Sequence, residues 1–433
     1  MRRIVWTLLL LFAFMVPWEY SLDFGEPWGN VARIVGLVLL VVAIPAALAK
    51  GRLKIPGAVM WLALALLLWL CCTAFWTVDA QATGEHLRAY LQEITVVWVI
   101  WEFAESPADL RALLRATLAG VSVLAVLTLA DAFSVEAVQG VQIRFAAAGQ
   151  DPNDVARFLD FGFPVAAYLL DTDGEWVGRL MALIYLPLGI TAVLLTASRG
   201  GFVAALVALA GCGFVLLRNY LRAVLLGGLV LPVVSASVWL MVPHATLERL
   251  GTIPDQLQGG DLNQRLNIWE AGWRAFAQAP FVGHGAGSFI AATGLATGDT
   301  AHNTALSLLV EGGVIALCLA AALVVALVGD ALLTRGSLRV ALCSLLAVWM
   351  VSSVVGTLAE SRMTWLLFGT IALAGRLAVE SNAELAASSR SSCTSSYISL
   401  NQRWRWVAGR AVSAAIAPLA SWIPHGTGRS PER

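Results

Sequence analysis

Long apolar runs separated by short polar connections recur along almost the whole chain of 433 residues. A helix that spans a bilayer needs about 20 predominantly apolar residues, because each residue adds about 1.5 Å to its length. Runs that meet or approach this length lie near 4–17, 31–49, 57–75, 87–104, 116–134, 158–170, 180–197, 201–217, 223–242, 304–328, 340–358 and 363–379. We therefore predict an all-α polytopic membrane bundle of about twelve transmembrane helices, in which 158–170 is the shortest run.

The composition excludes most other classes of protein. Hydrophobic residues make up 59% of the chain and charged residues 13%. Soluble domains contain about 45–50% apolar residues and about 25% charged residues. Lys+Arg and Asp+Glu are equal at 28 each, so the net charge gives no sign of a nucleic-acid partner. The six cysteines form no CxxC pair or Cys/His cluster, so we predict no metal site and no disulfide framework.

The short connections between the runs differ in their content of arginine and lysine. Alternate connections carry the basic residues Lys50, Arg52, Lys54, Arg111, Arg115, Arg179, Arg218, Arg222, Arg335 and Arg339. Short basic loops stay on the cytoplasmic side of a membrane, and these connections fall on the same side as Arg2 and Arg3. We therefore expect both termini in the cytoplasm.

The longest connection falls on the opposite, periplasmic side. We predict that residues 1–379 form the transmembrane domain and that 243–303 is its large periplasmic loop. Residues 380–433 are rich in serine and contain several arginines. This composition predicts a cytoplasmic, basic and partly disordered tail.

Several arginines lie in the outer connections, against the topological bias. They are Arg144, Arg157, Arg199, Arg249, Arg265, Arg274 and Arg362. An anionic ligand on the outer face would explain them, because arginine binds phosphate through two parallel hydrogen bonds. The alternative is ordinary ion pairing with acidic residues of the same loops, namely Asp151, Asp154, Glu248, Asp261 and Glu270.

The large loop contains a predicted helix that ends before Pro280. Four of its side chains recur at helical spacing and share one face: Arg265, Trp269, Trp273 and Phe276. Such a stripe either lies on the membrane surface or forms an aromatic and cationic wall facing a sugar-phosphate. The following Gly283-x-Gly285-x-Gly287 does not come after a strand, so it predicts a flexible connection rather than a nucleotide site.

His302 ends this loop and is followed by Asn303 and an apolar run that contains Glu311. A single histidine is usually structural, but imidazole is the side chain best suited to move a proton near neutral pH. An ionisable group inside a span is costly and is by default a functional candidate. The alternative for Glu311 is a hydrogen bond between helices beside Gly312 and Gly313.

Two further outer elements bring polar residues to the same face. Ser198-Arg199-Gly200-Gly201 forms a tight turn between two spans, where a cation also stabilises a helix C-terminus. Arg144 precedes the turn that contains Asn153. Together these segments suggest that arginines hold the diphosphate of a lipid-linked donor, while His302 accepts the proton of an attacking hydroxyl group.

These segments together resemble the signature of the O-antigen ligase and polymerase superfamily. They are His302-Asn303-x-x-Leu306-x-x-Leu309-x-Glu311-x-Gly313, Ser198-Arg199-Gly200-Gly201, the Pro152-Asn153 turn, and Arg265-x-x-x-Trp269 followed by Pro280-x-x-Gly283-x-Gly285. Their order and spacing match over about residues 140–320. One departure is Asp151, where the family often has asparagine.

The resemblance implies an inner-membrane glycosyltransferase of the GT-C type whose site faces the periplasm. Such proteins transfer glycan from an undecaprenyl-diphosphate carrier to an acceptor hydroxyl, on lipid A core or on a growing glycan. It implies that His302 is the catalytic base or activates the acceptor, and that Arg199 and Arg265 bind the diphosphate. We expect Arg144, Asn153, Ser198, Trp269, Asn303 and Glu311 to contact substrate, and we expect no metal, cofactor or nucleic acid.

The sequence leaves the exact reaction open. A ligase that joins polysaccharide to lipid A core, a polymerase of O-antigen or exopolysaccharide, and an enzyme that glycosylates protein hydroxyls would share these motifs. A transporter or flippase of lipid-linked sugars is the alternative from another class, because it too needs cations and aromatic residues along its path. A purely structural role is the remaining possibility.

Overall fold

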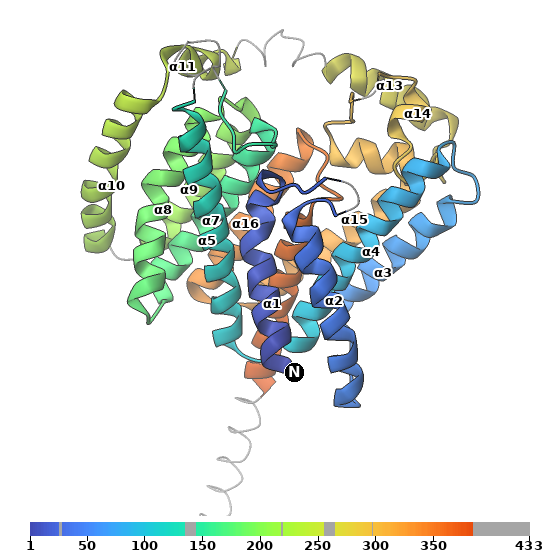
Figure 1. Cartoon of the computed structure of the whole chain (residues 1–433), viewed down its shortest axis with the longest axis horizontal. Coiled ribbons are helices and arrows are strands. Elements are labelled where there is room, and N and C mark those ends of the chain that lie inside the picture. Colours follow the sequence, from blue (N-terminus) through green and yellow to red (C-terminus); the bar gives the residue numbers. More distant parts are fainter. Residues whose placement is uncertain (26–27, 135–143, 218–219, 255–264, 297, 384–433) are drawn as a thin grey trace, which may run out of the picture. The chain divides into compact units, whose positions relative to one another are not determined.

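The computed structural model describes residues 1–25, 28–134, 144–217, 220–254, 265–296 and 298–383. Within these residues the secondary structure is helical apart from one isolated bridge between Asp23 and Asn30 (Figure 1). Met1–Leu377 form one compact unit. The tail predicted at 380–433 lies almost entirely outside the described residues.

Each predicted apolar run falls on a helix. The helices are α1 (Arg2–Met15, continued by the 3-10 helix Val16–Ser21), α2 (Val31–Lys50), α3 (Ala58–Thr73), α4 (Ala80–Phe103), α5 (Pro107–Asp131), α7 (Pro152–Thr172), α8 (Trp176–Leu195), α9 (Arg199–Leu216), α10 (Tyr220–Met241), α15 (Thr304–Leu333), α16 (Gly336–Val354) and Arg362–Ala383. Nine helices in the described part of the chain are long and apolar enough to cross a membrane. The all-α membrane bundle is therefore confirmed, whereas the count of twelve spans stays a prediction.

Helix α7 is surrounded by other helices of the bundle. It packs against α5, α8, α9 and α16, and every residue from Val155 to Leu170 is buried. Its charged residues Asp154, Arg157 and Asp160 lower its hydropathy, which explains why the sequence showed only a short apolar run there. A helix surrounded by protein can carry such residues, since they face protein instead of lipid.

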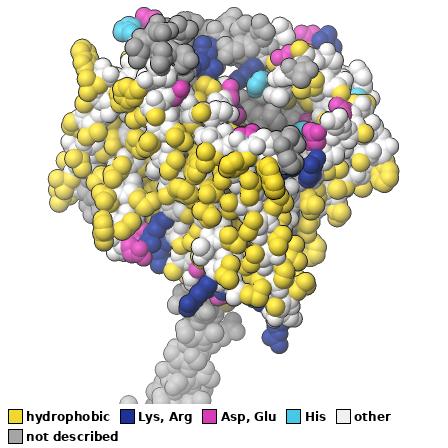
Figure 2. Space-filling model, viewed as in Figure 1, with side chains coloured by type: hydrophobic (Ala, Val, Ile, Leu, Met, Phe, Trp, Pro, Cys, Tyr) yellow, Lys and Arg dark blue, Asp and Glu magenta, His cyan; other side chains and the backbone are white. Residues whose placement is uncertain are grey.

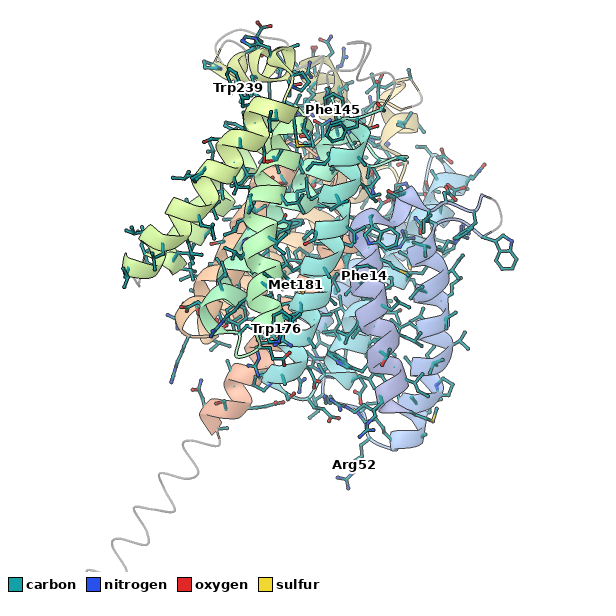
Figure 3. All side chains as sticks on the ribbon, turned by 60° about the vertical axis from the view of Figure 1, so that its left-hand side comes forward. Phe14, Arg52, Phe145, Trp176, Met181 and Trp239 are labelled. Atoms are coloured by element: carbon teal, nitrogen blue, oxygen red, sulfur yellow. The ribbon has the colours of Figure 1, made fainter. Side chains whose placement is uncertain are left out.

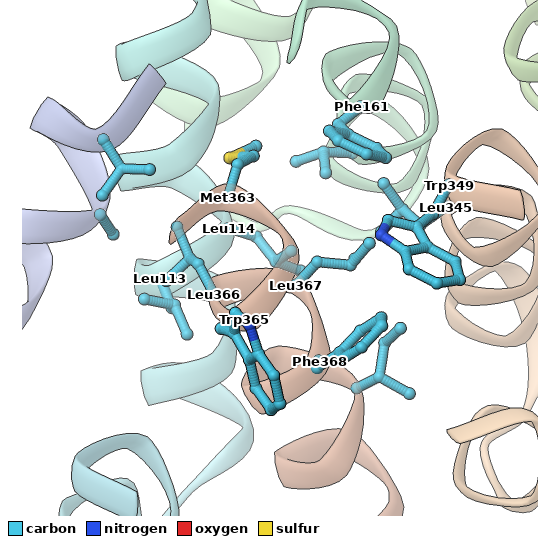
Figure 4. Close-up of a cluster of buried hydrophobic side chains, with 14 of the residues drawn as sticks. Leu113, Leu114, Phe161, Leu345, Trp349, Met363, Trp365, Leu366, Leu367 and Phe368 are labelled. Atoms are coloured by element: carbon cyan, nitrogen blue, oxygen red, sulfur yellow. The ribbon is translucent and has the colours of Figure 1, made fainter. Parts of the chain in front are cut away.

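The final helix, Arg362–Ala383, is also a core element. Its aromatic side chains pack on α16, with the rings of Trp349 and Phe368 5.1 Å apart, and Figure 4 shows Leu113 and Leu114 of α5 on its other side. Trp349 donates a hydrogen bond through Nε1 to Thr364 Oγ1 at 3.0 Å. This packing holds the turn before the helix, residues 357–361, in one place.

Figure 2 shows hydrophobic side chains across the middle of the visible face, with charged side chains mostly above and below them. In Figure 3, Arg52 lies at one end of the bundle, whereas Phe145 and Trp239 lie near the opposite end. The short basic connection around Arg52 and the loop around Phe145 are thus separated by the length of the helices. This separation agrees with the alternation of basic connections in the sequence.

Helix α15 is broken at Gly313, which has φ 68° and ψ −169°. The carbonyl groups at the break are paired with the preceding loop, because His284 N–H donates to Val310 O and Gly285 N–H to Glu311 O, each at 2.9 Å. Trp69 Nε1 donates to Gly312 O at 2.8 Å. The break is therefore a satisfied structural feature rather than a frayed helix.

The glycine motif in this loop is not the flexible connection that we predicted. Gly283, Gly285 and Gly287 all have positive φ, and Cβ atoms added there would meet the backbone of Glu311, the side chain of Thr77 and the ring of His86. These glycines are required for close packing. The sequence did not reveal this packing, because Thr77, His86 and Glu311 are distant from the loop in the chain.

Replacing Gly313 with alanine is expected to destabilise the protein. The conformation is almost exclusive to glycine and costs about 1–3 kcal/mol for other residues, and the added Cβ would also meet the Phe281 carbonyl group. Thermal unfolding in detergent should show a clearly lower midpoint. Gly329→Ala in the same helix, where no atom lies within 4 Å of the added Cβ, is the control, and equal midpoints for the two variants would contradict the prediction.

Candidate active site

A cavity of about 610 Å³ opens among the outer ends of several helices. Its lining includes residues of α4, α7, α13 (Arg265–Gln278), α14 (Phe289–Thr293) and α15, together with the turn at 357–361. The volume lies within the range of about 300–1,000 Å³ that is common for ligand sites. Four of the predicted site residues line it: His302, Arg265, Asn153 and Glu311.

His302 is held in the cavity wall by its neighbours along the chain. It has φ 44°, and among the described residues only Ala197 is another non-glycine residue with positive φ. Trp269 Nε1 donates to the Ala301 carbonyl at 3.0 Å, and the Asn303 side chain caps α15 by accepting from Leu306 N–H at 2.9 Å. Trp269 and Asn303 therefore fix the backbone on each side of His302 and are not part of the described cavity lining.

The surroundings of His302 keep its imidazole neutral. Burial, followed by the positive charges of Arg265 and Arg157, lowers the pKa of His302 below its ordinary value of 6.5, and Asp151 partly opposes this. A neutral imidazole can accept a proton, so the environment suits a general base.

Arg265 and Arg157 supply positive charge to the cavity. Arg265 begins the described part of α13 and is half-buried, and burial lowers its pKa, with Arg199 adding to the effect and Asp151 opposing it. Arg157 is only 7% exposed, forms an ion pair with Asp154, and its Nε has no hydrogen-bond partner in the described part of the chain. Our sequence analysis counted Arg157 among the outer arginines but did not select it as a site residue.

A second group of polar residues adjoins the cavity behind Asn153. Its Oδ1 accepts hydrogen bonds from Arg144 Nη2 and from Ser198 Oγ, both at 2.9 Å. Burial lowers the pKa of Arg144, and the nearby Arg249 adds to this. Arg199 follows Ser198 and donates to Thr252 Oγ1 at 3.3 Å. Arg144, Ser198 and Arg199 thus lie next to the site but do not belong to the described lining.

Glu311 is buried, and both of its carboxylate oxygens are hydrogen-bonded. Ser307 Oγ donates to Oε1 at 2.8 Å and Gly287 N–H to Oε2 at 2.9 Å. Neither bond joins two helices as the sequence alternative supposed, because Ser307 lies on α15 itself and Gly287 lies in the loop before it. The same carboxylate also lines the cavity, so contact with substrate stays a prediction.

Glu311 lies beside two residues that our sequence analysis missed. His86 Nδ1 pairs with Glu360 Oε1, and the ligand atoms of His86, Glu311 and Glu360 lie within 4.8 Å of one another. This spacing is compatible with a cation, although the group is already internally hydrogen-bonded. No motif marks His86 or Glu360; the only signal was that charged residues interrupt the apolar pattern of α4.

The family match agrees with this geometry. Residues 184–321 match the model of the O-antigen ligase family. This match supports the resemblance to the O-antigen ligase and polymerase superfamily. No curated protein matched the chain. The matched segment contains Arg199 and every cavity-lining residue from Arg265 to Glu311, whereas the other lining residues, including Arg157, lie outside it.

We expect activity that depends on His302 as a base to persist at mildly acidic pH. A base must be neutral, and a pKa below 6.5 leaves most of the His302 imidazole neutral at pH 6.5 and above. We expect kcat/KM to stay level from pH 8 to about 6.5 and to fall only below the lowered pKa. A profile measured from pH 5 to 8 tests this, and an acid limb centred above 6.5 would contradict it.

Proposed function

We propose that the protein is an inner-membrane glycosyltransferase that transfers glycan from an undecaprenyl-diphosphate-linked donor to an acceptor hydroxyl on the periplasmic face. The observation that carries the proposal is that His302, Arg265 and Arg157 share one cavity at the outer ends of the helices. The family match supports a ligase- or polymerase-like activity in general. The basic connections at the opposite end support a periplasmic site.

In the proposed reaction the acceptor oxygen attacks the anomeric carbon of the donor sugar. The bond between that carbon and the diphosphate oxygen breaks, and the diphosphate leaves with both electrons. His302 takes the proton of the attacking hydroxyl group. Direct displacement inverts the configuration at the anomeric carbon.

The arginines stabilise the charge that develops on the leaving diphosphate. Arg265 and Arg157 both line the cavity, and the Nε atom of Arg157 has no hydrogen-bond partner among the residues that the structure describes. Arg144 and Arg199 lie behind Asn153 and Ser198 and add positive potential. The donor carries its own activation, so the proposal needs neither ATP nor a metal ion.

A strain that lacks the gene tests the proposal. Loss of long chains from lipid A core, with accumulation of carrier-linked polymer, would indicate a ligase. Products with single repeats would indicate a polymerase, and loss of glycan from proteins would indicate a protein glycosyltransferase. Unchanged glycans on every acceptor, or donor trapped on the cytoplasmic side, would contradict the proposal, and the latter would favour a transporter.

A further inference from the structure

The cavity contains a second group of ionisable side chains that the proposed reaction does not use. His86 comes from α4, Glu311 from α15 and Glu360 from the turn before the last helix. Their polar atoms lie within 4.8 Å of one another although His86 and Glu360 are 274 residues apart in the chain. We call these three residues the acidic triad.

Neighbouring residues hold the acidic triad in a fixed arrangement. Gly287 has no side chain, and a Cβ there would lie 2.5 Å from Cδ2 of the His86 ring, so glycine lets this ring pack against the loop. The N–H of the same glycine holds Glu311, together with Ser307. Glu360 pairs with His86. Both carboxylates are thus pre-oriented before any ligand binds, which favours specific hydrogen bonding.

Charge is divided between two sides of the cavity. The charged groups that act most strongly on His302 are Arg265, Arg157 and Asp151, whereas those that act on His86 are Glu360, Glu311 and Glu85. These two sets share no member. A diphosphate is repelled by the carboxylates and attracted by the guanidinium groups, so the triad is left for a part of the substrate that carries no negative charge.

Carboxylates accept hydrogen bonds from hydroxyl groups, and such charge-assisted bonds are among the strongest in proteins. A sugar ring presents several hydroxyl groups at fixed spacing, and apolar surfaces are available beside the triad on Phe158, Phe289 and Ile290. The cavity volume of about 610 Å³ leaves room for sugar beside a diphosphate.

We propose that His86, Glu311 and Glu360 form a subsite that binds sugar hydroxyl groups and positions a glycan beside the donor diphosphate at Arg265 and Arg157. The inference rests on the proposed function, since it assumes a glycan substrate. The sugar belongs either to the donor or to the acceptor, because both present the same hydroxyl chemistry.

The test uses Glu360→Gln in the purified full-length protein. Glu360 is partly exposed, so a glutamine of the same shape is compatible with folding. We expect KM for either the donor or the acceptor to rise about 10- to 100-fold, as for the loss of one hydrogen bond to a charged group. Binding of undecaprenyl diphosphate without sugar should be unchanged. Glu248→Gln, an exposed glutamate of α11 (His244–Gly251), is the matched control and should behave as the wild type.

A rise in KM for the donor would show that the subsite binds the donor sugar, and a rise in KM for the acceptor would show that it binds the acceptor sugar. Either rise supports the subsite. Unchanged KM values for both substrates, or equal weakening of sugar-free and sugar-bearing carriers, would overturn it. A third outcome would assign the triad to a cation instead. In that case the wild type would bind Mn²⁺ stoichiometrically, Glu360→Gln would abolish this binding, and chelation would reproduce the change in KM.

Failure of the proposed function is recognised separately. In that case the wild type would neither transfer glycan nor bind undecaprenyl diphosphate. Titration with oligosaccharide released from the host's own surface polysaccharide still tests the subsite directly. Binding that Glu360→Gln weakens at least 10-fold would support it, and absence of binding to the wild type would overturn it.

Discussion

Transfer by the His302→Ala variant is expected to be about 10²- to 10⁴-fold slower than by the wild type, because a positioned general base contributes a rate factor of this size. Alanine removes the proton acceptor, while Trp269 and Asn303 continue to hold the backbone on either side. The protein should insert and accumulate normally. Initial rates with carrier-linked donor, divided by the amount of folded protein, give the measurement.

The matched control for this variant is His244→Ala. His244 lies in α11 (His244–Gly251) at the outer end of the protein, and its side chain is 88% exposed. Its replacement should leave the rate unchanged. If His302→Ala retained more than a tenth of the wild-type rate, the base assignment would be wrong, and His86, which pairs with a carboxylate, would become the next residue to test.

The second large effect is expected for Arg265→Lys, with a loss of roughly 100-fold in kcat, comparable to the removal of one group that stabilises an oxyanion. Lysine keeps the positive charge but cannot form two parallel hydrogen bonds with a phosphate group. Because the diphosphate gains charge as it leaves, kcat should fall more than the affinity for the donor. Steady-state kinetics and direct binding of undecaprenyl diphosphate separate the two quantities.

Arg274→Lys is the control on the same helix. Arg274 is largely exposed, and its Nη1 atom lies 3.9 Å from Oε1 of Glu270 in an i,i+4 pair. Such exposed pairs contribute little to stability. It should behave as the wild type. Equal kinetics for Arg265→Lys and Arg274→Lys would mean that charge alone is sufficient at Arg265, and the role of a bidentate phosphate ligand would be abandoned.

Several features of this site were accessible from the sequence. His302 and Glu311 were selected as ionisable residues beside or inside an apolar run, and Arg265 as an arginine in a loop that should lack it. Asn153 was selected because the Pro152-Asn153 turn is part of the resemblance. All four line the same cavity. Trp269 and Asn303 were also selected, but the structure gives them supporting roles, since side-chain direction depends on packing that a helical spacing does not specify.

Other features required the folded chain. Arg157 lies in the buried helix α7, where a weak apolar run gave little reason to choose one charged residue over another. His86 and Glu360 belong to no motif and meet only because α4 and the last helix converge beside α15. The glycine loop at 283–287 looked flexible until the break in α15 provided partners for its backbone.

The sequence by itself determined that the chain is a helical membrane protein and which ends of its helices carry the basic connections. It also carries the motifs that resemble the O-antigen ligase and polymerase superfamily. These are properties of consecutive residues: the length of an apolar run, the bias of a short loop, the spacing of a motif. Only the tertiary structure decided which polar groups face one another across the cavity. That arrangement depends on contacts between segments hundreds of residues apart, and such contacts are set by the packing of whole helices rather than by any local pattern.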